Sequence, residues 1–171
     1  RSSNSFPHSS GIASSASGMS ALSLCIMSLE KELTEIDMNY MFQKASFISR
    51  IGSGSACRSI YGGINFWGNH KEVSKSSDFY SVRMDEHISS KFDNYRDTIL
   101  IIDNQAKEVS SSVGHKLMDN HPFSQIRFEQ ANQNILKLKS IFSSGDLNQF
   151  CDLVEKEALM LHSLMMSSEP S

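Results

Sequence analysis

The sequence predicts an α+β fold, and three patterns in it carry that prediction. Apolar residues recur at helical spacing near the N-terminus, two short alternating stretches follow, and helical periodicity returns after Gly114. Helices, then strands, then helices is an order typical of α+β proteins. We also expect a domain boundary close to residue 95, with residues 1–95 in one domain and 96–171 in the next.

Two helices are predicted first. One covers residues 16–31, with serines and alanines filling most of the positions between its apolar residues. Its predicted apolar face consists of Met19, Leu22, Ile26, Leu29 and Leu33. The second helix runs from Thr34 or Glu35 to about Arg50, and Thr34 is a candidate cap. Two glycines within four residues, Gly52 and Gly54, then end it.

Strands and further helices follow. Residues 60–67 and 79–84 alternate as strands do, and the polar stretch between them is typical of a hairpin loop. Residues 97–104, "DTILIIDN", are apolar on both faces and predict a central strand. Helical spacing then predicts helices over about 123–142 and 146–166, separated by a Ser-Ser-Gly turn.

Composition excludes several classes of protein. The net charge is −3, so nucleic acid is a poor default partner and any anion must be met by a local site. Three cysteines without CxxC spacing favour reduced thiols over a zinc site or a disulfide framework. We find no apolar run of membrane-spanning length and no signal peptide, so we expect a cytoplasmic protein that does not bind membranes. The start at Arg1 and the end in "SSEPS" favour a piece of a longer protein.

The run "PHSSGIASSASG", residues 7–18, leads directly into the first predicted helix. A helix N-terminus carries unpaired N–H groups and partial positive charge, small residues let an anion approach them, and hydroxyls add donors. The run therefore fits a phosphate cradle. It equally fits a serine-rich cap followed by a small-residue packing seam. No GKS or GKT follows, so it is not a P-loop.

A second run, "RIGSGSACRSIYGG", covers residues 50–63. Two glycines allow a tight turn, and Arg58 offers a planar fork of donors that suits a carboxylate or a diphosphate. The plain alternative is a helix C-terminus with a surface arginine.

Both runs resemble motifs of one family. The first is similar to the GHMP kinase superfamily motif P-x-x-x-G-L-x-S-S-A, and most closely to its diphosphomevalonate decarboxylase version; Ile12 replaces the leucine, and His8 and Ser9 depart from the usual T-A. The second resembles the decarboxylase signature G-S-G-S-A-C-R-S-L-F/Y-G-G. Residues 99–115 are similar to a family strand and loop. Glu157 and His162 align with an acidic residue and a histidine of a family helix, and we interpret both as structural.

The resemblance implies a GHMP-kinase-like fold. Part of an N-terminal domain like ribosomal protein S5 would be followed by part of a C-terminal ferredoxin-like α/β domain. It implies ATP-dependent decarboxylation of mevalonate 5-diphosphate to isopentenyl diphosphate, in the mevalonate pathway of isoprenoid and lipid biosynthesis. ATP and Mg²⁺ are the implied cofactors. We expect a homodimer.

The resemblance also implies roles for particular residues. The residues implied to bind ATP phosphates are Gly11, Ala13, Ser14, Ser15 and Ser17, with Ser15 as the candidate Mg²⁺ ligand. The residues implied to bind substrate are Ser53, Ser55, Arg58, Ser111 and Ser112, with Arg58 as the catalytic candidate. The family's catalytic aspartate motif has no counterpart in the sequence, so we expect this chain to be inactive alone.

Two alternatives remain open at this point. A small-molecule kinase of the mevalonate or phosphomevalonate type would share the fold, but such kinases usually place an aspartate where this chain reads "GSGSACRS". A non-catalytic nucleotide-binding or dimerisation module would keep the first loop without the chemistry.

Overall fold

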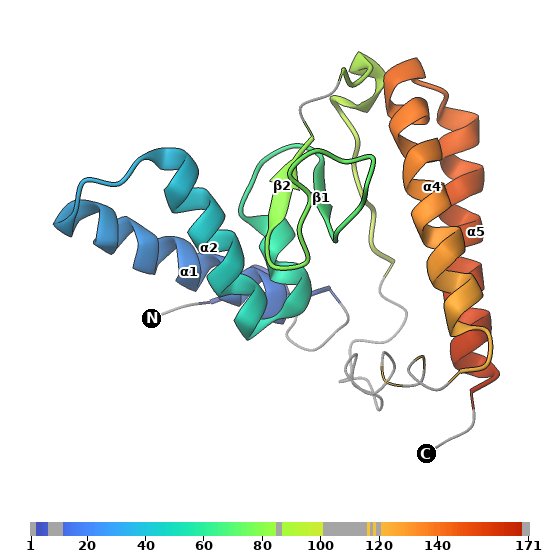
Figure 1. The fold of residues 1–171 in the computed structure, drawn as a ribbon, viewed down its shortest axis with the longest axis horizontal. Coiled ribbons are helices and arrows are strands. Elements are labelled where there is room, and N and C mark those ends of the chain that lie inside the picture. Colours follow the sequence, from blue (N-terminus) through green and yellow to red (C-terminus); the bar gives the residue numbers. More distant parts are fainter. Residues whose placement is uncertain are drawn as a thin grey trace. The chain divides into compact units, whose positions relative to one another are not determined.

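The computed structural model describes residues 3–6, 12–84, 87–100, 116, 118 and 121–168. The chain divides into two compact units, residues 1–85 with 99–107 and residues 86–98 with 108–171 (Figure 1). Each unit is described by itself below. The domain boundary expected near residue 95 stays a prediction, because these units are defined only by contacts within the chain.

The first unit opens with the two predicted helices, α1 (Ser14–Leu33) and α2 (Met38–Gly52), and α2 folds back along α1 (Figure 1). Thr34, the candidate cap of α2, does not cap this helix. Asp37 is the N-cap, and its carboxylate accepts hydrogen bonds from the N–H groups of Asn39 at 2.8 Å and Tyr40 at 3.0 Å. Thr34 ends α1 instead, since its hydroxyl donates to the carbonyl of Glu30.

The buried face of α1 differs from the predicted one. Leu22, Leu29 and Leu33 are 52%, 62% and 75% exposed. The buried residues of the helix are instead Ala16, Ser20, Ser23 and Met27. Ser20 and Ser23 satisfy their hydroxyls by donating to carbonyls of the preceding turn, Ser17 and Met19. The prediction followed hydrophobicity, whereas the structure uses the small face because it allows α2 to approach closely.

The core of the first unit consists of Met27, Met41, Ala45 and Ile60, with further apolar side chains packed against it. Outside it, Lys44 on α2 and Glu30 on α1 form an ion pair at 2.7 Å. A tight 3-10 turn, η1 (Gly54–Ser59), follows α2 directly. The predicted break at the two glycines is therefore a compact turn and not an open loop.

The predicted hairpin is confirmed, with shorter strands. β1 (Asn65–Trp67) pairs antiparallel with β2 (Ser81–Arg83), and Phe66 lies opposite Val82. Of the predicted central strand over 97–104, residues 97–100 are irregular and the rest lie outside the described residues.

The second unit contains a short 3-10 turn, η2 (Ser90–Phe92), and the helices α4 (Ser124–Ser144) and α5 (Leu147–Met166), close to the predicted bounds. Phe92, Ile141 and Leu153 form its apolar centre. The ring of Phe92 lies edge-on to that of Phe142, with centroids 5.1 Å apart. Gly145 ends α4 with a φ of 73°, which is the conformation that favours glycine.

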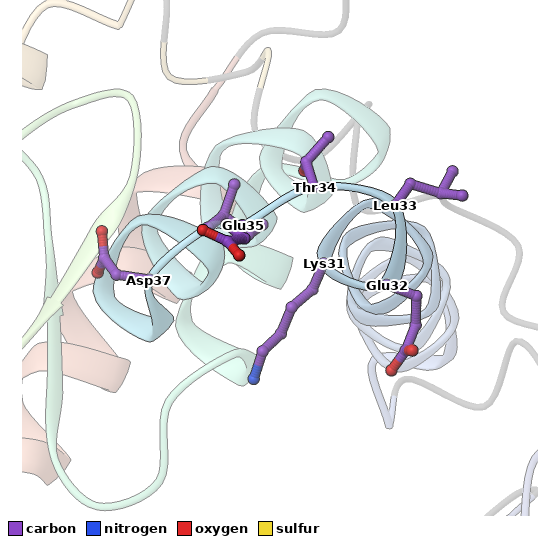
Figure 2. A pocket seen from close by; sticks show the side chains of 7 residues that line it. Lys31, Glu32, Leu33, Thr34, Glu35 and Asp37 are labelled. Atoms are coloured by element: carbon purple, nitrogen blue, oxygen red, sulfur yellow. The ribbon is translucent and has the colours of Figure 1, made fainter.

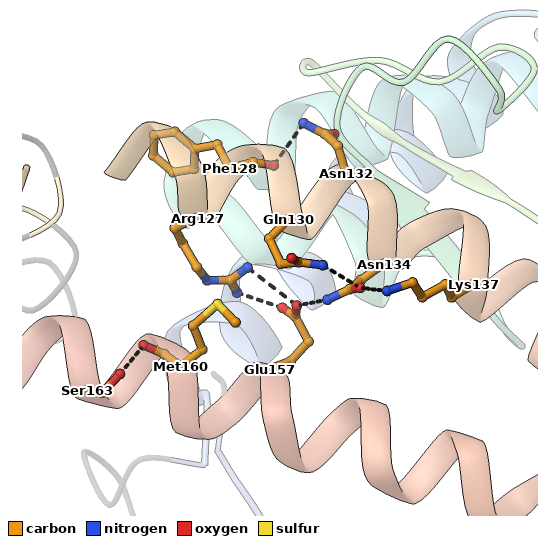
Figure 3. Close-up of polar contacts among 9 residues, drawn as sticks. All are labelled: Arg127, Phe128, Gln130, Asn132, Asn134, Lys137, Glu157, Met160 and Ser163. Carbon is orange, nitrogen blue, oxygen red and sulfur yellow. Dashed lines mark hydrogen bonds and ion pairs between the residues drawn. The ribbon is translucent and has the colours of Figure 1, made fainter. Parts of the chain in front are cut away.

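A polar network joins α4 to α5 (Figure 3). Arg127 on α4 pairs with Glu157 on α5 at 2.6 Å, and Asn134 donates to the same carboxylate. The side-chain oxygen of Asn134 accepts from Gln130 at 3.0 Å and Lys137 at 3.1 Å. This position agrees with the interpretation of Glu157 as a structural residue.

The connection between α1 and α2 forms a shallow, open depression lined by residues 31–37 (Figure 2). It lies at the end of α1 opposite the predicted phosphate run and includes no predicted site residue. In the part of the chain that the structure describes, no helix combines the length and the apolar character needed to cross a bilayer.

The N-cap of α2 provides a first test. Asp37→Ala should lower the free energy of unfolding of the first unit by about 1 kcal/mol, because two helical N–H groups lose their acceptor. Urea denaturation followed by the fluorescence of Trp67, the single tryptophan, measures this unit. Thr34→Ala is the matched control and should cost clearly less; equal losses for both variants would contradict the assigned cap.

The network between α4 and α5 provides a second test. Arg127 and Glu157 side chains are 12% and 26% exposed, so Glu157→Leu leaves a largely buried guanidinium without its carboxylate. We expect a loss of about 2–3 kcal/mol. Adding Arg127→Met should recover most of it, since an apolar pair of similar volume replaces the ion pair.

Amide hydrogen exchange along α5 measures these variants of the second unit. Glu129→Gln is the control, because Glu129 is exposed on α4 and accepts a hydrogen bond from Gln125 within the same helix. A Glu157→Leu variant as stable as this control would show that the network contributes nothing.

Candidate functional site

The start of α1 has the features expected of an anion-binding end. Ala13 is the N-cap residue in the left-handed region, with a φ of 58°, and its methyl side chain cannot accept a hydrogen bond from the first turn. The amide of Ser17 donates to the carbonyl of Ala13 at 3.1 Å, which closes the first turn. Ala13 and Ser15 are exposed, and Ser14 and Ser17 are half-buried. Gly11 lies outside the described residues.

The second run begins where α2 ends. Ser53 is extended, its N–H donates to the carbonyl of Ser49 at 2.9 Å, and its own carbonyl accepts from Ala56 at 2.8 Å. The backbone therefore leaves the helix and enters η1 without an unpaired group at Ser53. Ser55 is half-buried within the turn, and Arg58 near its end is exposed.

One contact brings the two runs together. The hydroxyl oxygens of Ser15, in the first turn of α1, and Ser53, at the end of α2, lie 3.2 Å apart. They are 38 residues apart in the sequence. The close approach of α1 and α2 makes this contact possible. The side chain of Met19 on α1 occupies the space that a Cβ at Gly52 would need. A residue implied to bind ATP and one implied to bind substrate thus share one surface of the first unit.

The side chain of Asn65 holds the backbone from Arg58 onward. The Asn65 amide donates to the carbonyls of Arg58 at 3.3 Å, Tyr61 at 3.1 Å and Gly63 at 3.1 Å. The Asn65 side chain on β1 therefore binds three backbone carbonyls of the segment that starts at Arg58. Ser111 and Ser112, the remaining predicted substrate residues, lie outside the described residues.

An aromatic support beneath the turn was missed by the sequence reasoning. The guanidinium of Arg50, in the last turn of α2, lies 5.7 Å from the ring centroid of Trp67 and 5.9 Å from that of Phe79. The same indole borders Gly54, where an added Cβ would lie 3.5 Å from it. The indole N–H donates to the carbonyl of Asp78 at 3.0 Å. Arg50 stands at the start of the second run, but spacing alone could not show what it stacks on.

Cys57 is not a candidate nucleophile. Its thiol donates to the carbonyl of Gly54 at 3.2 Å and is fully buried. Burial raises the pKa of the Cys57 thiol, and the nearby positive charges of Arg58 and Arg50 only partly oppose this. A neutral buried thiol has neither the charge nor the access that nucleophilic chemistry requires.

The chain is similar to one family model and to several known proteins. Residues 1–79 match the family model described as diphosphomevalonate decarboxylase-like N-terminal domain. A diphosphomevalonate decarboxylase from Candida albicans is 31% identical over 98% of this chain and 44% of its own length. The enzyme of the same name from Homo sapiens is 27% identical over 98% of this chain and 39% of its own length.

A solved structure is similar as well. The crystal structure of a mevalonate diphosphate decarboxylase from Legionella pneumophila is 33% identical, with a TM-score of 0.74 over 97% of this chain and 48% of that one. The fold is therefore the α+β fold of the GHMP kinase class. The chain belongs to the diphosphomevalonate decarboxylase family. It spans about two fifths of the length of the first relatives that it matches.

The stack on Trp67 gives a third test. Arg50→Met removes a cation from between two rings, so we expect a loss of about 1 kcal/mol in the first unit and a red shift of the tryptophan emission. Arg50→Lys should keep part of the stability. Thermal unfolding followed by fluorescence measures both quantities. Arg83→Met is the control, because Arg83 is exposed on the neighbouring strand; an unchanged emission in Arg50→Met would reject the stack.

Proposed function

We propose that the full-length protein is an ATP-dependent decarboxylase that converts mevalonate 5-diphosphate to isopentenyl diphosphate for isoprenoid biosynthesis. The contact between Ser15 and Ser53 carries this proposal, because it joins the run that resembles the family's ATP-phosphate loop to the run that resembles its substrate loop. The names of the relatives support the same substrate and reaction.

The first turn of α1 fits the phosphates of a nucleotide. Its cap is Ala13, which supplies no side-chain acceptor for the N–H groups of the turn, and the helix end favours negative charge. Ser15 is exposed and carries a hydroxyl that suits a phosphate oxygen or Mg²⁺. Bound Mg²⁺ would neutralise charge on the transferring phosphoryl group. Ala13, Ser14 and Ser17 would complete the cradle, together with Gly11.

Arg58 would pair with the substrate carboxylate. Its side chain is exposed on a turn whose Arg58 carbonyl accepts a hydrogen bond from Asn65, and its planar guanidinium offers a fork of donors for a bidentate contact. Ser53 and Ser55 would donate to the substrate diphosphate, with Ser111 and Ser112 as further donors. Holding the carboxylate and the diphosphate at separate points orients the tertiary hydroxyl toward the nucleotide.

The family's catalytic aspartate motif, which would supply the general base, has no counterpart in this sequence. We propose that an aspartate elsewhere in the full-length protein takes the hydroxyl proton, and that the 171-residue chain binds ligands without completing the reaction. Full-length protein with ATP, Mg²⁺ and mevalonate 5-diphosphate should release CO₂. Accumulation of a stable phosphorylated product would favour the kinase alternative, and neither product would favour a non-catalytic module.

Arg58 gives the test that this chain allows. Arg58→Ala and Arg58→Lys should both weaken binding of mevalonate 5-diphosphate by about tenfold or more, since a lysine ammonium cannot form the two-pronged contact. Isothermal titration calorimetry measures the affinity. Arg83→Lys is the matched control and should bind as the wild type does. Equal affinities for the wild type and Arg58→Ala would remove Arg58 from the substrate site.

Two further expectations complete the proposal. A cytoplasmic location fits the reduced cysteines expected from their spacing, and a homodimer follows from the family resemblance. Sedimentation of the full-length protein would test the dimer.

A further inference from the structure

The carbonyl of Cys57, directly before Arg58, has an unusual set of donors. The hydroxyl of Ser46 on α2 donates to it at 3.0 Å, and the hydroxyl of Ser81 on β2 donates to it at 2.6 Å. Both serines are fully buried, as is Cys57 itself. Three elements, α2, η1 and β2, therefore meet at one peptide oxygen.

Both hydroxyl protons of this cluster are used in hydrogen bonds. Each hydroxyl has one proton, and both point to the Cys57 carbonyl, whose oxygen can accept two hydrogen bonds. The hydroxyl oxygen of Ser46 in turn accepts from the backbone N–H of Ser81 at 3.0 Å. The two hydroxyl oxygens lie 3.2 Å apart, so the cluster is closed and accessible neither to solvent nor to ligand.

We infer that Ser46 and Ser81 are positioning residues that fix the direction of Arg58 in the substrate site. This inference rests on the proposed role of Arg58. The serines fix the peptide on the N-terminal side of Arg58, while Asn65 holds the carbonyl on its C-terminal side. The peptide groups on both sides of Arg58 are therefore held by hydrogen bonds. A bidentate contact needs such support, because it depends on the position from which the side chain extends.

The alternative is that these serines only stabilise the core. Ser49 separates the two roles, because it is also fully buried on α2 but donates to the carbonyl of Ser46 within the same helix, at 2.9 Å. Removing its hydroxyl perturbs the same region without touching the turn. A matched pair of variants, Ser81→Ala and Ser49→Ala, therefore distinguishes positioning from general packing.

The first measurement needs no ligand. Amide hydrogen exchange over residues 54–63 should become at least about fivefold faster in Ser81→Ala and in Ser46→Ala than in Ser49→Ala, because a buried carbonyl that loses its donors makes opening of the turn easier. Ser81→Thr, which keeps the hydroxyl, should restore the wild-type rate. Equal exchange in Ser81→Ala and Ser49→Ala would overturn the inference.

The second measurement uses mevalonate 5-diphosphate and calorimetry on the same chain. Affinity should fall by about tenfold in Ser81→Ala, and by less than about twofold in Ser49→Ala and Ser81→Thr. Faster exchange with unchanged affinity in Ser81→Ala would also overturn the inference, since the turn would then not need to be held. Absence of binding by the wild-type chain would count against the proposed binding role of this chain, whereas the exchange comparison would still decide whether the serine pair holds the turn.

Discussion

The close approach of α1 to α2 is the constraint on which the rest of the first unit depends. Alanine and serine side chains line the buried face of α1, and Gly52 lies against Met19 where α2 ends. Larger residues at these points would separate the helices and take Ser15 away from Ser53. The small residues of α1 therefore serve both packing and the geometry of the candidate site. They allow α2 to approach, and the second run, residues 50–63, begins in the last turn of α2.

The second run, residues 50–63, is supported by contacts from the elements packed against it. Arg50 stacks on Trp67 and Phe79, and the indole supports the turn at Gly54. Buried hydroxyls and one amide side chain then satisfy the carbonyls around Arg58. Apolar packing alone would stabilise the turn but would not fix its peptide orientation, whereas hydrogen bonds are directional. The buried polar groups around the turn thus set the backbone position from which the Arg58 side chain extends.

The second unit combines two kinds of contact between its long helices. Aromatic rings around Phe92 cluster near the α4–α5 turn, and further along the pair the helices meet through Arg127, Asn134 and Glu157. A largely buried ion pair adds little stability over an apolar pair, but its removal from one side is costly. This network therefore favours one register of α4 against α5 over alternatives that would leave a charge unpaired.

The sequence by itself determined the fold class, the long helices α1, α2, α4 and α5, the hairpin and the two runs that resemble family motifs, because periodicity and glycine positions are local signals. It did not determine which face of α1 is buried, since hydrophobicity favoured Leu22 and Leu29 while close packing selected Ser20 and Ser23. It also placed the cap of α2 at Thr34 instead of Asp37. Only the tertiary structure could join Ser15 to Ser53, stack Arg50 on Trp67 and bring Ser46 and Ser81 to one carbonyl. Those contacts join residues far apart in the chain, and no local pattern encodes the distance between them.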